Sequence, residues 1–194
     1  MKGTVLLVIV LLFSFVNPGY SENKLESWYT YWGLGYAGVS YPDELQEAID
    51  ILKDLPGVTN ASISLDILGF YWPMGEQTIL GGIINGFGDR YEVDGMDIQL
   101  NGYIYGFSAM HFVQNRIGQG LFLRSDIGPA RMMITSSSQN TSESSDWGFG
   151  FAAGLGYGFS ITPGTRLLLN AKYAIRQVEG ESYTNFEISV GGLF

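Results

Sequence analysis

Residues 147–161 constrain the fold more than any other part of this chain. Every odd position holds an apolar or aromatic residue: Trp147, Phe149, Phe151, Ala153, Leu155, Tyr157, Phe159 and Ile161. The even positions from 148 to 158 hold only glycine and alanine. Because side chains alternate along a strand, one face is apolar and the other is almost bare. A soluble sandwich or a lipocalin-type carrier would leave the bare face empty or exposed, whereas a membrane barrel has lipid outside and packed side chains inside.

The last twelve residues, 183–194, show the same alternation with a polar inner face. Phe186, Ile188, Val190, Gly192 and Phe194 share one face, and Asn185, Glu187 and Ser189 share the other. The pattern predicts a strand with one face in lipid and one face in a polar interior.

A chain that ends on phenylalanine after such a strand resembles the small bacterial outer-membrane β-barrels of the OmpA/OmpX type, within the porin-like superfamily. The resemblance implies a Gram-negative outer membrane, with its lipid and lipopolysaccharide as surroundings. It also implies that the β-barrel assembly machinery reads the last strand as a signal through Phe186, Ile188, Val190 and Phe194. This strand would then close the barrel against the first one.

The amino-terminal segment predicts export. Lys2 precedes an apolar run over residues 5–16, and Gly19 and Ser21 have the spacing of a cleavage site, which is typical of a signal peptide over residues 1–21. Cleavage would leave residues 22–194, or 194 − 21 = 173 residues, as one barrel domain. The chain has no cysteine, and its formal charge of −9 argues against a nucleic-acid partner.

Strand patterns and turn signals predict an all-β fold, an eight-stranded antiparallel up-and-down transmembrane β-barrel. The expected strands cover residues 28–41, 61–72, 77–87, 96–112, 121–135, 147–161, 167–176 and 183–194. Long connections are expected after the first, third, fifth and seventh strands and short ones after the others, which would place both termini in the periplasm. The facing of the third strand and of Arg131 stays open, and Pro129 predicts a bulge or kink.

Two connections have a character of their own. Residues 42–55 predict a short amphipathic helix in the first long loop, either folded onto the barrel or acting as a plug or outer recognition element. Residues 136–146 are polar without apolar periodicity and predict a mobile loop.

The candidate site is the barrel interior, because the inward charges are the residues able to do chemistry there. The predicted network consists of Asp66, Arg124, Asp126, Lys172 and Glu187, with Arg176 one step higher. An eight-stranded barrel is just wide enough for side chains to fill, so these charges are expected to pair in a packed core. The alternative interpretation of the same residues is a small ion- or solute-conducting pore.

No residue pattern predicts catalysis, a cofactor or a metal. A lipid A-modifying enzyme would need a histidine beside a serine, but His111 and Ser108 have opposite parity and should face opposite sides of their strand. The sequence therefore predicts an integral outer-membrane protein with a structural or surface-interaction role through its extracellular loops. It does not name the ligand of those loops.

Overall fold

The computed structural model describes residues 25–93, 95–114, 116–136 and 141–194. The predicted signal peptide, residues 1–21, lies outside the described residues. The elements in chain order are β1 (Tyr29–Ser40), α2 (Asp43–Asp54), β2 (Thr59–Pro73), β3 (Thr78–Val93), β4 (Met96–Phe112), β5 (Gly120–Ser136), β6 (Thr141–Ser144), β7 (Gly148–Thr162), β8 (Thr165–Val178) and β9 (Glu181–Leu193). Within this part of the chain, no helix is both long enough and apolar enough to span a membrane.

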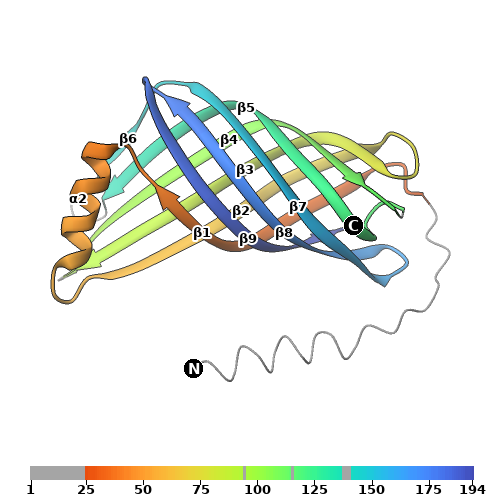
Figure 1. Cartoon of the computed structure of the whole chain (residues 1–194), viewed down its shortest axis with the longest axis horizontal. Helices are drawn as coiled ribbons and strands as arrows, with labels where there is room; N and C mark the ends of the chain where they lie inside the picture. Colours follow the sequence, from red (N-terminus) through yellow and green to blue (C-terminus); the bar gives the residue numbers. More distant parts are fainter. Residues whose placement is uncertain (1–24, 94, 115, 137–140) are drawn as a thin grey trace.

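Eight of the described strands close into an antiparallel barrel, which confirms the predicted fold class. Each barrel strand pairs with its neighbour in the chain, and β9 returns to pair with β1 over ten residue pairs from Tyr31↔Leu193 to Ser40↔Thr184. Among the described strands, the short strand β6 pairs only with the end of β5. Figure 1 shows α2 and β6 at one end of the barrel and the carboxyl terminus at the other. We call these the outer end and the C-terminal end.

The predicted faces are confirmed where the sequence alternates cleanly. On β7 the aromatic and aliphatic side chains are exposed outward, while Ala152, Gly156 and Gly158 are buried inside. On β9, Phe186 and Ile188 point outward while Asn185 and Glu187 are buried. An added Cβ at Gly156 would meet the Phe122 ring, so the bare face of β7 makes room for large side chains from other strands.

The facing of β3 and β4 differs from the simple pattern. Ile79 and Ile83 point inward, which settles the question that the sequence left open. On β4 the buried residues include Leu100 and Ile104, whereas Tyr103 and Tyr105 lie on the outer face. By analogy with β7 and β9, the alternation of this strand would place its aliphatic face in lipid, but the lumen itself is apolar at this level.

Of the bulge or kink predicted at Pro129, the bulge is absent from the described pairings. The β5–β7 register runs without a shift through Gly128↔Gly150, Pro129↔Phe149 and Ala130↔Gly148. The missing N–H is tolerated because Pro129 lies at a gap in the β4–β5 ladder. Arg131 lies on the outer face, with its guanidinium 5.4 Å from the centre of the Trp147 ring.

The predicted alternation of loop lengths is only partly correct. Only two residues separate β3 from β4, at 94–95, and β8 from β9, at 179–180, whereas the connection between β4 and β5 at the C-terminal end spans residues 113–119. Long loops were expected after the third and seventh strands, but there β3 and β4, and likewise β8 and β9, continue as hairpins. The mobile loop predicted over residues 136–146 lies partly outside the described residues, at 137–140, and Thr141–Ser144 form the strand β6, which pairs with Met133–Ser136 of β5 at the outer end.

The helix α2 covers the outer end of the lumen. It follows Pro42, carries Asp43 and Glu44 in its first turn and Lys53 in its last, and so matches the helix dipole. Ile49 is buried in an apolar cluster with Tyr41, Tyr91 and Leu100. The helix predicted over 42–55 is confirmed, and it is packed on the barrel.

Candidate functional site

The lumen is filled in layers. An apolar layer at the C-terminal end contains the rings of Tyr29, Tyr71, Phe112 and Phe122. A second apolar layer around Phe87, Ile104 and Met132 lies nearer the outer end, beneath the cluster that α2 completes. The lumen also contains ion pairs, which lie between the first two layers and are formed by Asp66, Arg124, Asp126, Lys172 and Glu187. We call them the charge belt.

Asp66 on β2 is the central acceptor of the charge belt. Arg124 Nη1 and Nη2 donate to its two oxygens at 2.7 and 2.9 Å, and Lys172 Nζ donates at 2.8 Å. Asn85 Nδ2 adds a fourth donor at 2.9 Å. This carboxylate is 1% exposed, so its charge is stabilised by two cations in place of water.

Arg124 joins Asp66 to a second carboxylate. Its Nε and Nη2 donate to Asp126 at 3.0 and 2.7 Å, and its guanidinium lies 5.3 Å from the centre of the Tyr31 ring. Asp126 also accepts from Ser108 at 2.6 Å. Since one guanidinium bonds two buried acids, Arg124 is the cation on which the belt depends most.

Lys172 bridges the belt to Glu187 on the neighbouring strand. The two residues are directly paired in the β8–β9 register, and Lys172 Nζ lies 3.1 Å from Glu187 Oε2. Glu187 further accepts from Ser64 and Asn185, each at 2.6 Å. The structure thus brings five of the six predicted network residues into one connected set of ion pairs.

Arg176, the sixth, is placed differently. It donates to Asn85 Oδ1 at 3.0 Å and to Asn185, and its guanidinium lies 4.9 Å from the centre of the Phe87 ring. Within the described residues it forms no salt bridge, and its Nε has no hydrogen-bond partner. Arg176 is therefore joined to the belt through amides.

Sequence reasoning missed two buried charges. Asp89 falls in the connection expected between the strands over 77–87 and 96–112, but it lies on β3 and points into the lumen, where Tyr41, Tyr91 and Asn60 donate to it at 2.8, 2.6 and 2.8 Å. Ser62 is a fourth donor. Arg166 on β8 is 1% exposed, and its guanidinium lies 5.1 Å from the centre of the Tyr29 ring. Arg166 is separated from Asn170 and Lys172 by even numbers of residues, so the alternation of the strand could have placed it on the same inner face.

The buried charges balance. Among the described residues, four acids and four bases are buried: Asp66, Asp89, Asp126, Glu187, Arg124, Arg166, Lys172 and Arg176. The negative charge of the chain therefore resides on its surface and ends.

Ser108 and His111 do not form a catalytic pair. Ser108 is buried in the lumen, whereas His111 is exposed on the outer face with its Nδ1 2.9 Å from Thr78 Oγ1. In the part of the chain that the structure describes, no group of three or more metal-ligating side chains is placed to hold a metal ion.

Three of the residues proposed as an assembly signal line the outer face of β9, and the fourth, Phe194, follows the strand. Phe186, Ile188, Val190 and Phe194 are all exposed. The Phe194 ring stacks on Trp32 with centroids 6.2 Å apart, and its backbone exchanges two hydrogen bonds with Thr30. The end of the chain therefore lies against β1 at the barrel seam.

No protein-family model and no curated protein matches the chain. Solved structures do. Ail, the attachment invasion locus protein of Yersinia pestis, is 15% identical over 88% of this chain and 100% of that one, with a TM-score of 0.51. Neisserial surface protein A is 13% identical over 88% and 97%, with a TM-score of 0.56. A structure of Ail in complex with the heparin analogue sucrose octasulfate is 14% identical over 87% and 100%, with a TM-score of 0.50. At these identities the likeness is one of fold, and it makes this chain an eight-stranded barrel of the outer-membrane type.

Proposed function

We propose that this chain is an integral outer-membrane protein with a closed lumen, which acts by binding a partner at its outer end and not by transport or catalysis. We propose that the outer end, with α2 and β6, faces the outside of the cell. Both termini then face the periplasm. The fold of the chain and its apolar outer wall support the location.

The observation that carries the proposal is the filled lumen. The charge belt is enclosed between two apolar layers, and α2 packs over the outer end with Ile49 4% exposed. Buried charges of this kind are tolerable because they are paired, and pairing uses the space that an ion would need. In this proposal the closed barrel serves as a rigid support for the surface at its outer end.

The displayed surface is acidic. The helix α2 carries five acids, Asp43, Glu44, Glu47, Asp50 and Asp54, against Lys53. Glu143 and Asp146 lie around β6, and Glu179 and Glu181 lie at the β8–β9 turn. A surface of this sign favours a basic partner and disfavours a sulfated ligand of the kind seen with Ail. We therefore propose a protein partner with a basic surface.

A binding measurement tests the role of the outer end. The variant Glu44→Gln/Glu47→Gln/Asp50→Asn should lose binding to polylysine-coated beads relative to the wild-type barrel in liposomes. A matched control is Glu26→Gln/Glu76→Gln, which removes acids from the C-terminal end and should bind as the wild type does. Equal binding by all three proteins would refute an outer acidic recognition surface.

The second candidate function is a narrow pore, and one observation favours it. Among the described side chains, Arg166 Nε and Nη1, Asn170 Oδ1, Arg176 Nε and Ser189 Oγ are buried without a hydrogen-bond partner. Buried polar groups of this kind are commonly bonded to water. Planar-bilayer conductance of the refolded protein separates the two candidates: a closed barrel gives no stepwise current, and a steady conductance would favour the pore.

We further propose that the last strand directs assembly. Because Phe194 packs at the seam between β9 and β1, its deletion should reduce the folded barrel in the outer membrane and leave protease-sensitive chain in the periplasm. Deleting Leu25 instead, an exposed residue outside the strands, is the control. A normal level of heat-modifiable barrel without Phe194 would contradict this assignment.

A further inference from the structure

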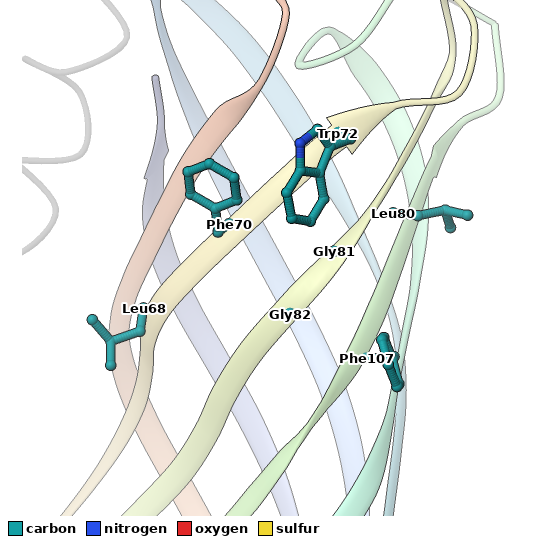
Figure 2. Close-up of a pocket in the computed structure, with 7 residues that line it drawn as sticks. All are labelled: Leu68, Phe70, Trp72, Leu80, Gly81, Gly82 and Phe107. Carbon is teal, nitrogen blue, oxygen red and sulfur yellow. The ribbon is translucent and has the colours of Figure 1, made fainter.

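The outer wall of the barrel carries an apolar groove of about 540 Å³ across β2, β3 and β4 (Figure 2). It is lined by Leu68, Phe70, Trp72, Leu80, Gly81, Gly82 and Phe107. Gly82 lies between Phe70 and Phe107 in the register of the three strands. The position is open, because a Cβ added there would have its nearest heavy atom, Gly106 O, at 3.9 Å. Gly82 therefore forms the floor of a gap between the rings of Phe70 and Phe107, which we call the slot.

A β-bulge shapes one end of this slot. Leu68 has a φ of 53°, which is uncommon for leucine, and the β2 register shifts between Ile67 and Phe70. Ile67 and Leu68 consequently both point outward, and Leu68 is 75% exposed. Bulges re-aim side chains, and this one adds Leu68 to the groove.

A polar pair lies beyond the other end. Trp72 and Leu80 are paired, Leu80 is paired with Ala109, and two residues further along the same strands Thr78 is paired with His111. Thr78 Oγ1 and His111 Nδ1 are 2.9 Å apart, and the His111 side chain is exposed on the outer face. The wall therefore offers an apolar slot followed by a hydroxyl and an imidazole, in the direction of the C-terminal end.

We propose that this groove is a phospholipid site, in which one acyl chain occupies the slot and the phosphate is bound by Thr78 and His111. The order of the features matches the order of groups in a glycerophospholipid, with the apolar tail deep and the phosphate near the membrane surface. The C-terminal end faces the periplasm in the orientation of the proposed function, on which this inference rests. The ligand is thus a glycerophospholipid of the periplasmic leaflet.

A second copy of the chain is the competing occupant, because Phe107 is 78% exposed beside the Gly82 slot. A protein contact formed by this knob and slot would leave the Thr78–His111 pair without a role. A phospholipid uses both the slot and the polar pair, which is why we prefer it.

The test is native mass spectrometry of the full-length protein, extracted from bacterial outer membranes in a mild detergent. The wild-type barrel should retain one phospholipid. Gly82→Leu, which fills the slot, should lower the retained fraction about tenfold. Ala153→Leu is the matched control, since it adds the same bulk to an exposed position on the outer face of β7, and it should retain the lipid. His111→Ala should also lower retention, to a smaller extent.

The outcomes separate the inference from the proposed function. Equal retention by Gly82→Leu and Ala153→Leu would overturn the site. A wild-type dimer that Gly82→Leu converts to a monomer would assign the groove to a second copy. Retained lipopolysaccharide instead of phospholipid would reverse the orientation and so refute the location of the outer end. A conducting barrel that still retains one phospholipid through Gly82 would refute the closed lumen and leave this site standing.

Discussion

Asp66 and Asp89 are buried carboxylates in the same barrel, and they are stabilised in opposite ways. Asp66 accepts from two cations, Arg124 and Lys172, at 2.7 to 2.9 Å. Asp89 accepts from two tyrosine hydroxyls, an asparagine amide and a serine hydroxyl. Within the described residues, no salt bridge reaches it.

The difference follows from where each acid lies. The cations at Asp66 come from β5 and β8, so its ion pairs join strands that a closed barrel holds rigidly together. The donors to Asp89 include Tyr41, which lies between β1 and α2. The donors to Asp89 carry no charge. A hydrogen bond contributes about 0.5–1.5 kcal/mol, or about 1.5–3 kcal/mol when one partner is charged, whereas removing one member of a buried ion pair costs about 3–5 kcal/mol. We therefore expect Asp66 to stabilise the barrel itself, and Asp89 to stabilise the attachment of α2 to the barrel.

The largest effect is expected from Arg124→Met. Asp66 and Asp126 would both lose their arginine, and the folded barrel should lose roughly 3–5 kcal/mol of stability, less if water enters. Urea unfolding in lipid vesicles measures this change. Arg131→Met is the control, because Arg131 lies on the outer face of the same strand and stacks on Trp147, a contact worth about 1 kcal/mol. Similar losses for the two variants would mean that the belt is hydrated.

The next effect concerns Lys172, whose ammonium contacts both Asp66 and Glu187. Lys172→Met should cost about 3 kcal/mol, the lower end of the range for a broken buried pair, because Asp66 keeps Arg124. Adding Glu187→Gln should recover only part of this loss, because Asp66 still lacks one of its cations. The double-mutant cycle should give a coupling of about 0.5–1.5 kcal/mol in the same unfolding assay. Strict additivity would show that Lys172 and Glu187 do not interact, and the pore alternative would gain.

The sequence predicts the barrel well because lipid on one face imposes a strict period of two on β7, β8 and β9. The same rule misleads on β3 and β4. There the lumen is apolar at two levels, around Ile79 and Ile83 and again around Phe87 and Ile104. Hydrophobicity then marks both faces of a strand, and it no longer distinguishes lipid from interior.

The site was predicted in its centre and missed at its edges for a related reason. Asp66, Arg124 and Lys172 stand out because each lies on the polar face of a strand whose other face is mainly apolar. Asp89 stands among polar residues and suggests a loop, but the β3–β4 hairpin continues to residues 94–95. Which cation meets which acid depends on the barrel cross-section, because Asp66 and Arg124 come from strands that are not neighbours.

A smaller effect is expected at the outer end, from Asp89→Asn. The neutral amide keeps part of the hydrogen bonding, so the barrel should lose about 1–2 kcal/mol or less, while α2 loosens. Limited trypsin digestion at Lys53 measures the helix separately from the barrel core. Glu92→Gln is the control, since Glu92 is exposed and its contact with Arg90 is also exposed. Unchanged protection of Lys53 in Asp89→Asn would remove Asp89 from the attachment of α2.

The smallest effect, and the one that isolates the attachment, is expected from Tyr41→Phe. It deletes one hydroxyl that donates to Asp89 at 2.8 Å and should cost about 0.5–1.5 kcal/mol of helix docking. Burial and the neighbouring Asp89 carboxylate hold the pKa of Tyr41 well above its usual range. A raised folded-state pKa means that this contribution is complete below the ordinary tyrosine pKa of ~10 and is lost as the pH rises above it. Protection of Lys53 in the wild type should therefore stay constant from neutral pH to about 10 and then fall, with a shallower fall in Tyr41→Phe. A loss of protection already at about pH 8, in both proteins alike, would show that another group fastens the helix.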